Sequence, residues 1–262
     1  MTKHSITNIS KILAFGLSAT AVSVMSAQSA SAAAFTTDVG FTQLTGSINT
    51  GANTSDIGIF RADFSTLGGD ISSILLRDSG NLAGATSQFS GFDLDSIILS
   101  TTLINDASQI NTVSGLGVFD FTPAGTVLTP GTQRAPADPA LFGTSGGNID
   151  NTVATLGSFD GNLFDTVGNG DPADFVGSGF ASLGDNGEVL FNLTSAVSAA
   201  GPLYLYVGDV GNNGESLGQV TVSGQHNVVT PPTSVPEPAT LAALSLMGVY
   251  FASRRKQAAK TV

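Results

Sequence analysis

Short apolar stretches separated by turn-forming residues constrain the fold of this chain more than any other feature of its sequence. Between residues 35 and 225 no window keeps the apolar period of 3.6 residues that marks an amphipathic helix. Gly, Pro, Asn or Asp bounds each stretch instead, as is typical of strands that end in turns. We predict strands at 57–64, 73–77, 94–101, 116–121, 125–128, 153–159, 189–193, 203–207 and 219–222. Many short strands joined by turns predict an all-β domain, a β-sandwich or jelly roll.

The strand pattern is clearest late in this region. In residues 202–207 leucine and valine alternate with tyrosine, so that the aliphatic side chains face one side and the tyrosines the other. Residues 188–193 alternate in the same way, and we expect them to form the neighbouring strand. One short helical turn is predicted at 106–110 and another at 193–199.

Charge and cysteine content exclude several classes of function. The chain has no cysteine, which excludes disulfides, thiolate metal sites and thiol nucleophiles. Residues 35–235 contain three arginines, no lysine and nineteen acidic residues, a net charge of about −16. Such a surface repels nucleic acid and anionic lipid, so we expect neither as a partner, and cations are its natural counterpart.

The residues needed for common catalytic sites are scarce. His226 is the one histidine between residues 35 and 235, which argues against a Ser-His-Asp triad and against a histidine-based zinc site. The chain has no tryptophan to serve as a sugar-binding platform. We therefore predict no enzyme and no catalytic residues. A secreted glycoside hydrolase, which needs only two carboxylates, is the least favoured alternative.

Two turns have similar sequences, 184–188 and 211–215, and each contains Asn-Gly. The simpler interpretation is a pair of tight hairpin turns, because Asn-Gly readily adopts positive φ angles. The alternative is a Ca²⁺ site, since oxygen-rich loops containing glycine suit a hard cation. Its candidate ligands are Asp209, Asn212, Asn213 and Glu215 in the second turn, or Asp185 and Glu188 in the first. No other cofactor is expected.

Two further features have two interpretations each. Asp93 and Asp95 alternate on a predicted strand and face the same side, which a solvated sheet face explains as well as a cation site. Residues 129–151, which include Arg134, and residues 160–179 are predicted to be long surface loops. Loops of this length are often binding rims.

Both ends of the chain have the composition of targeting segments. Residues 1–34 combine Lys3 and Lys11, an apolar stretch and a run of small residues, as in a secretory signal peptide. We expect the mature chain to begin near Ala33 or Phe35. At the other end, residues 226–235 form a predicted polar linker before the tail.

The tail has three parts in a fixed order. Pro236 and Pro238 keep the backbone around Glu237 extended, a shape that fits an enzyme's cleft. Residues 239–252 carry no charge and predict a transmembrane helix, although about 21 Å of helix is short for a core of roughly 30 Å. The stop-transfer cluster then consists of Arg254, Arg255 and Lys256. Because such clusters stay in the cytoplasm, the rest of the chain is expected outside the inner membrane.

The order Pro-Glu-Pro, apolar helix and Arg-rich end, placed at residues 236–258, resembles the bacterial PEP-CTERM sorting signal. The resemblance implies that Pro236, Glu237 and Pro238 are recognised by an exosortase, a membrane enzyme that cleaves nearby. It also implies an exported protein of the kind commonly linked to extracellular polysaccharide or biofilm matrix. It says nothing about the fold or the ligand of the preceding domain.

These observations predict a signal peptide at 1–34, a β-sandwich ectodomain at 35–225, a linker at 226–235 and a sorting and anchor segment at 236–258. The expected function is that of a structural or adhesive protein, anchored in the inner membrane in transit and then placed at the cell surface or outside it. The alternative is a module that binds carbohydrate or Ca²⁺ in the extracellular polysaccharide matrix. Signal peptidase and an exosortase-like enzyme are the expected processing partners.

Changing Glu237→Ala, or deleting residues 236–238, should leave export intact and block processing, because the helix and its cationic end remain while the cleavage signal is lost. An unprocessed membrane-bound form should accumulate, as measured by immunoblotting of membrane fractions over time. Trimming of the variant at the wild-type rate would disprove the sorting role of the tripeptide.

Overall fold

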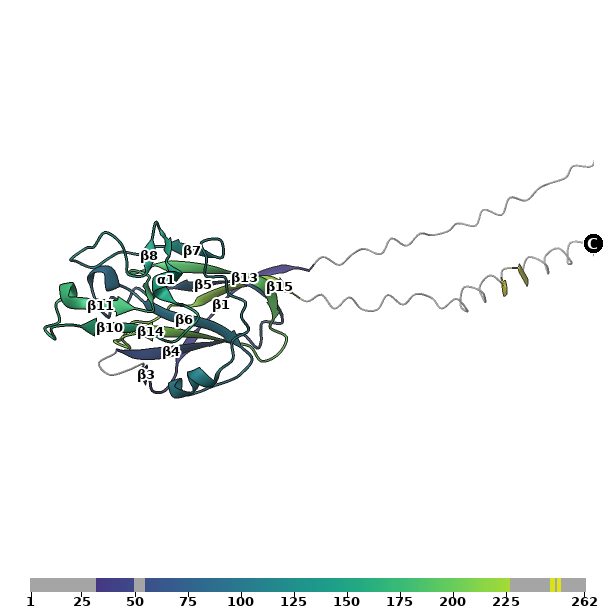
Figure 1. The fold of residues 1–262 in the computed structure, drawn as a ribbon. Coiled ribbons are helices and arrows are strands. Elements are labelled where there is room, and N and C mark those ends of the chain that lie inside the picture. The colour runs from purple at the N-terminus through teal and green to yellow at the C-terminus, as the bar shows by residue number, and fades with distance from the viewer. Residues whose placement is uncertain (1–31, 50–54, 227–245, 248, 251–262) are drawn as a thin grey trace, which may run out of the picture. The chain divides into compact units, whose positions relative to one another are not determined.

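A computed structural model of the 262-residue chain describes residues 32–49, 55–226, 246–247 and 249–250. The described body is built almost entirely from antiparallel strands, which confirms the all-β prediction. Its strands form two large sheets and two small hairpins (Figure 1).

The first large sheet has five strands in the order β1-β15-β5-β13-β7. Their bounds are Ala34–Val39 (β1), Val220–His226 (β15), Gly69–Arg77 (β5), Glu188–Ser198 (β13) and Thr126–Thr129 (β7). β1 and β15 are adjacent and antiparallel, so the body begins and ends side by side in this sheet.

The second large sheet has the order β12-β6-β14-β4-β2, and a further short strand, β3, also pairs with β4. Their bounds are Ala181–Ser182 (β12), Asp93–Ser100 (β6), Tyr204–Val210 (β14), Asp56–Asp63 (β4), Phe41–Gln43 (β2) and Ile48–Asn49 (β3). We call the two large sheets the five-stranded and the six-stranded sheet.

The remaining elements are short. The hairpins pair β8 (Thr144–Ser145) with β9 (Asn148–Ile149) and β10 (Asn162–Asp165) with β11 (Phe175–Ser178). The helices are the 3-10 turns η1 (Ser87–Phe89), η2 (Ala107–Thr112) and η3 (Pro172–Asp174) and one α-helical turn, α1 (Asn151–Ala154).

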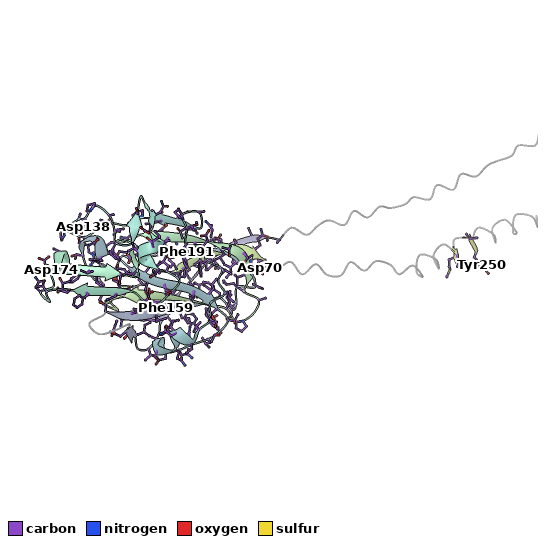
Figure 2. The ribbon with its side chains drawn as sticks, viewed as in Figure 1. Asp70, Asp138, Phe159, Asp174, Phe191 and Tyr250 are labelled. Atoms are coloured by element: carbon purple, nitrogen blue, oxygen red, sulfur yellow. The ribbon has the colours of Figure 1, made fainter. Side chains whose placement is uncertain are left out.

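One hydrophobic core lies between the two large sheets, as in a β-sandwich. The five-stranded sheet contributes Ile71, Ile74, Leu76, Val189, Phe191, Val220 and Val222, and the six-stranded sheet contributes Phe60, Ala62, Leu94, Ile97, Leu99, Leu205 and Val207. Phe191 lies in the middle of the body (Figure 2).

The six-stranded sheet is also covered on its outer face. Ile57, Ile59 and Tyr206 pack there against Ile104 and Ile110, from the segment around η2. The Tyr206 hydroxyl donates to the carbonyl of Thr102 at 2.8 Å and accepts from the Ile104 amide at 2.9 Å. Burial on both faces explains why the sequences of β4 and β14 are apolar at most positions rather than strictly alternating.

Several predicted elements agree with the structure. The strands predicted at 57–64, 73–77, 94–101, 125–128, 189–193, 203–207 and 219–222 correspond to β4, β5, β6, β7, β13, β14 and β15. The helical turn predicted at 106–110 corresponds to η2.

Other local predictions were wrong. Residues 153–159 are not a strand, because Asp150 caps the α1 turn by accepting from the Thr152 amide at 3.1 Å. Residues 193–199 are not helical, because β13 continues through a bulge to Ser198. Residues 116–121 make a single bridge, between Phe119 and Leu193, rather than a strand.

The predicted pairing of 188–193 with 202–207 was also wrong, since β13 and β14 belong to different sheets. β13 pairs with β5 and β7, while β14 pairs with β4 and β6. The loop predicted at 160–179 contains the β10–β11 hairpin, and the loop predicted at 129–151 contains β8 and β9.

The predicted signal peptide and linker lie outside the described residues, apart from their edges at 32–34 and His226. Of the predicted transmembrane segment only residues 246–247 and 249–250 are described, and these are helical. Within the part of the chain that the structure describes, no helix has both the length and the apolar character needed to span a membrane.

Candidate functional site

Acidic side chains gather at one end of the sandwich. Asp78 follows β5, Asp93 begins β6, and Asp209 lies one residue before the end of β14. Asp185 and Glu215 lie on the connections that precede β13 and β15. Since β5 and β14 end where β13, β15 and β6 begin, the antiparallel register places all five at the same end. We call these five residues the acidic cluster.

Two turns of similar sequence deliver Asp185 and Glu215. Residues 183–187 lead from β12 in the six-stranded sheet to β13 in the five-stranded sheet, and residues 211–219 lead from β14 to β15 between the same two sheets. Neither turn closes a hairpin of paired strands, so the hairpin prediction was wrong. The first Asn-Gly pair has the expected positive φ at its asparagine, 62° at Asn186. In the second turn the positive φ angles fall on Asn212, 44°, and Gly214, 98°, rather than on Asn213.

Arg134 is the cation that faces the cluster. Its Nε lies 3.2 Å from Asp185 Oδ1 and its Nη2 lies 3.8 Å from Glu215 Oε1. Neither contact has the geometry of a hydrogen bond. Its Nη1 donates to the carbonyl of Leu82 at 2.8 Å, and its backbone amide donates to Ser90 Oγ at 2.9 Å. Arg134 is thus held in place and offers the acids one positive charge.

Asp78 has a structural role. Its Oδ1 accepts from the Phe92 amide at 3.1 Å, and its Oδ2 accepts from the amides of Gly80 and Asn186, both at 2.8 Å. These three donors join β5, the start of β6 and the first sheet-crossing turn. The carboxylate of Asp78 is therefore satisfied by backbone donors, as buried carboxylates usually are.

Three members of the cluster have no such compensation. Asp93, Asp209 and Glu215 are 0%, 1% and 3% exposed. Ser182 Oγ donates to Asp93 Oδ1. The other Asp93 oxygen and both oxygens of Asp209 and Glu215 are buried without a hydrogen-bond partner. Burying a carboxylate without a partner costs several kcal/mol. These five oxygens are therefore among the least satisfied polar atoms of the described body, together with Asp95 Oδ2 and Asp185 Oδ1.

The surroundings of these three side chains raise their pKa values. Burial raises the pKa of Glu215, and the nearby charges of Asp93 and Asp209 raise it further. Burial likewise raises the pKa of Asp93 well above its ordinary value and raises the pKa of Asp209. On the same strand as Asp93, burial raises the pKa of Asp95 to about 8, although Gly161 and Asp160 amides donate to its Oδ1.

The residues proposed from sequence as calcium ligands separate into two groups. The structure brings Asp209 and Glu215 to the same buried place. Asn212 lies elsewhere, with its Oδ1 accepting from Gln43 Nε2 at 2.8 Å, and Asn213 is exposed with its side chain beside Gly211. In the alternative set, Glu188 pairs with Arg77 at 2.6 Å and Asp185 faces Arg134.

Sequence reasoning missed the role of Asp93. The alternation of Asp93 and Asp95 was visible, but a solvated sheet face was the wrong explanation, because both side chains are fully buried. Within residues 32–49 and 55–226, no group of three or more His, Cys, Asp or Glu side chains stands arranged as a finished metal site.

A separate surface feature surrounds two phenylalanines. Phe119 and Phe121 stack with ring centroids 5.9 Å apart and planes 9° from parallel. Beside them lies an open hollow of about 640 Å³ with Asp120, Asn148 and Asn151 among its lining residues. A second hollow, of about 480 Å³, shares the same two rings. Aromatic faces bordered by amide and carboxylate groups can bind a polar ring such as a sugar.

The sorting and stop-transfer residues lie outside the described residues: Pro236, Glu237, Pro238, Arg254, Arg255 and Lys256. Comparison with family models finds the PEP-CTERM protein-sorting motif at residues 234–256, which confirms the resemblance of the tail. The motif indicates an exported protein that an exosortase-like enzyme sorts and processes near the membrane. None of the curated proteins and none of the solved structures that were compared matches this chain.

Without added divalent cations, the body should lose stability as the pH rises from about 5 to 8. A buried carboxyl whose folded pKa is raised binds its proton more tightly when folded, so its contribution is present at low pH and is lost as the pH approaches the folded pKa. For Asp95 this window runs from 3.8 to about 8. The Tm of the full chain, measured in chelator at constant ionic strength, should fall by roughly 5 °C or more.

Two variants identify the source of this change. Asp95→Asn should make the decline shallower, because the side chain no longer ionises. Asp63→Asn should leave it unchanged, since Asp63 is exposed and a hydrogen bond from Ser65 lowers its pKa, so it stays ionised across the window. A Tm that is constant or rises between pH 5 and 8 would contradict the prediction.

Proposed function

We propose that this chain is a structural or adhesive protein of the cell surface or extracellular matrix, whose tail serves for sorting and whose β-sandwich is displayed outside the cytoplasm. The observation that carries the proposal is the sorting motif at residues 234–256, which follows a folded body that ends with β15 at His226. In this arrangement the tail determines where the protein goes, and the body supplies what is displayed there.

The body is suited to display because its two ends meet. Ala34 pairs with Gln225, and the His226 amide donates to the carbonyl of Ala33 at 2.8 Å. β1 thus begins where the predicted signal peptide ends, and the last strand closes beside it. A body closed in this way keeps its core when a segment at either end is removed. Processing at both ends is therefore compatible with a stable product.

We propose a binding or structural role rather than a catalytic one. The members of the acidic cluster are at most 7% exposed, so a polysaccharide cannot approach their carboxylates. His226 lies at the end of β15 with its ring 4.8 Å from that of Phe35, far along the strands from the acidic cluster. A hydrolase would need an acid and a base within reach of its substrate.

Protease treatment of intact cells and cell fractionation test whether the body is exposed outside the cytoplasm. An epitope placed between Gly146 and Gly147, where nothing lies within 4 Å of an added side chain, should be accessible to protease on intact cells that express an exosortase. A chain that lacks residues 236–258 should be exported as well but recovered away from the membrane, because the sorting segment is gone. An epitope that protease reaches only after lysis would overturn the proposal.

A second candidate function is carbohydrate binding at the stacked phenylalanines. It is favoured by the hollow beside Phe119 and Phe121, whose lining includes Asp120, Asn148 and Asn151. A ring packed on an aromatic face and held by polar groups at its edge is a common mode of sugar recognition. Tyr204 and Tyr206, the tyrosines of the described body, are buried and cannot take this role.

If this hollow binds sugar, Phe121→Ala should weaken binding to extracellular polysaccharide about tenfold or more, because the stacking surface is lost. The measurement is retention of the full chain on immobilised polysaccharide from the producing cells. Val176→Ala is the matched control, since Val176 on β11 is an apolar side chain that is 58% exposed. Equal retention of wild type and Phe121→Ala, at equal Tm, would eliminate this site.

A further inference from the structure

Buried carboxylates without hydrogen-bond donors lie near the end of β14, and burying them opposes folding. Asp209 lies between β6 and β4, opposite Leu94 on one side and Gly58 on the other, and is 1% exposed. Neither of its carboxylate oxygens has a hydrogen-bond partner. The Asp209 carboxylate lies beside the Glu215 side chain and the Asp93 backbone, and its charge in turn acts on the Asp93 carboxyl.

The charge of this end is poorly balanced by the protein itself. Asp78, Asp93, Asp185, Asp209 and Glu215 are all buried there. Arg134 is the cation that ion pairs with the cluster in the described part of the chain, and it faces Asp185 and Glu215 rather than Asp93 or Asp209. Asp78 is compensated by three backbone amides. The unmet negative charge therefore centres on Asp93, Asp209 and Glu215.

We propose that Asp93, Asp209 and Glu215 bind one Ca²⁺ ion at this end of the sandwich. Their free atoms are all carboxylate oxygens, the ligands that a hard cation prefers. A bound calcium ion would place two positive charges beside five carboxylate oxygens that have no hydrogen-bond donor. The ion would take the place of the amide or hydroxyl donors that these oxygens lack. The inference is independent of the proposed display function, since it concerns how the body is stabilised rather than where it is sent.

Calcium suits this set of residues better than magnesium does. Calcium accepts six to eight oxygens in irregular geometry and takes bidentate carboxylates, so three buried acids can fill most of its shell. Magnesium requires a strict octahedron and usually keeps several of its waters, for which a site this deeply buried is a poor match. Transition metals favour nitrogen or sulfur ligands, and neither is present among these three side chains.

Binding requires the side chains to move, because they do not stand arranged as a finished metal site. Asp93 and Asp209 are fixed by neighbouring strands of one sheet, so their backbones are preorganised. Glu215 lies on the connection between β14 and β15 and can rotate without breaking a strand. It is directed inward against Gly84, where an added Cβ would lie 1.7 Å from Oε1. The glycine at position 84 is thus needed to admit the Glu215 carboxylate.

The test compares the full chain, purified in a mild detergent at pH 7.5, in chelator, in NaCl and in a CaCl₂ series at matched ionic strength. The wild-type Tm should rise and saturate, by about 5–10 °C at free Ca²⁺ about 100 times Kd, and chelator should reverse the rise. NaCl should not reproduce it, because screening of exposed charge does not saturate in the same way. Titration calorimetry with CaCl₂ should give one site per chain.

Substitutions locate the ion. Asp209→Asn and Glu215→Gln should each abolish the calcium-dependent rise while raising the Tm in chelator, because each replaces a buried carboxyl group whose oxygens have no hydrogen-bond donor. Asp63→Asn is the control: it removes one exposed charge from β4 of the same sheet, and the asparagine can still accept from the Ser65 amide. It should respond to calcium as the wild type does.

Three results would overturn the inference. The first is identical wild-type Tm in chelator, NaCl and CaCl₂, which would mean that protons alone neutralise the cluster. The second is a calcium response that persists in both Asp209→Asn and Glu215→Gln, which would place the ion among exposed acids. If both variants fail to fold, calorimetry on the wild type still decides, because an absence of saturable binding contradicts the site.

Discussion

Burial of apolar side chains between the two large sheets is the interaction on which the rest of this structure depends. The chain has no cysteine, so no disulfide supports an exported fold, and the sheets must be held by their shared core. Aromatic rings fill much of it, with Phe60 and Phe92 in edge contact at 5.6 Å and Phe119 in edge contact with Phe191 at the same centroid distance. The segment around η2 covers the outer face of the six-stranded sheet and extends this burial.

The connections that cross between the sheets explain why acidic residues meet at one end. A sandwich of this topology returns the chain from one sheet to the other after β12 and after β14, and each return carries one acid, Asp185 or Glu215. The strands that end there add Asp78 and Asp209. Backbone amides satisfy Asp78, while the buried oxygens of Asp209 and Glu215 have no hydrogen-bond donor and Arg134 approaches only Glu215 of the two.

The sorting motif and the folded body occupy different parts of the sequence. The sorting motif occupies residues 234–256, whereas the described body closes at His226 beside the start of β1. A motif recognised by its own short sequence places no requirement on the fold that precedes it. The body is therefore free to be shaped by what it meets outside the cytoplasm, and its net charge of about −16 makes cations the partners that it attracts most strongly.

Features that depend on neighbouring residues were predictable from the sequence alone. The Pro-Glu-Pro tail, the all-β class and the positive φ at Asn186 each follow from residues a few positions apart. One local prediction still failed: Asp150 caps α1, whose last two residues begin the stretch predicted as a strand at 153–159.

Strand pairing and the burial of charged side chains depend on the tertiary fold and were not predictable from the sequence. Alternation in 188–193 and 203–207 marks two strands but not their sheets, because pairing depends on contacts between residues far apart in the chain. The same holds for Asp93, which is 116 positions from Asp209 and joins it because β6 and β14 are neighbours. An Asp-x-Asp alternation looks the same in the sequence whether its sheet face is solvated or buried. Whether the two carboxylates are exposed or buried depends on what packs against that face.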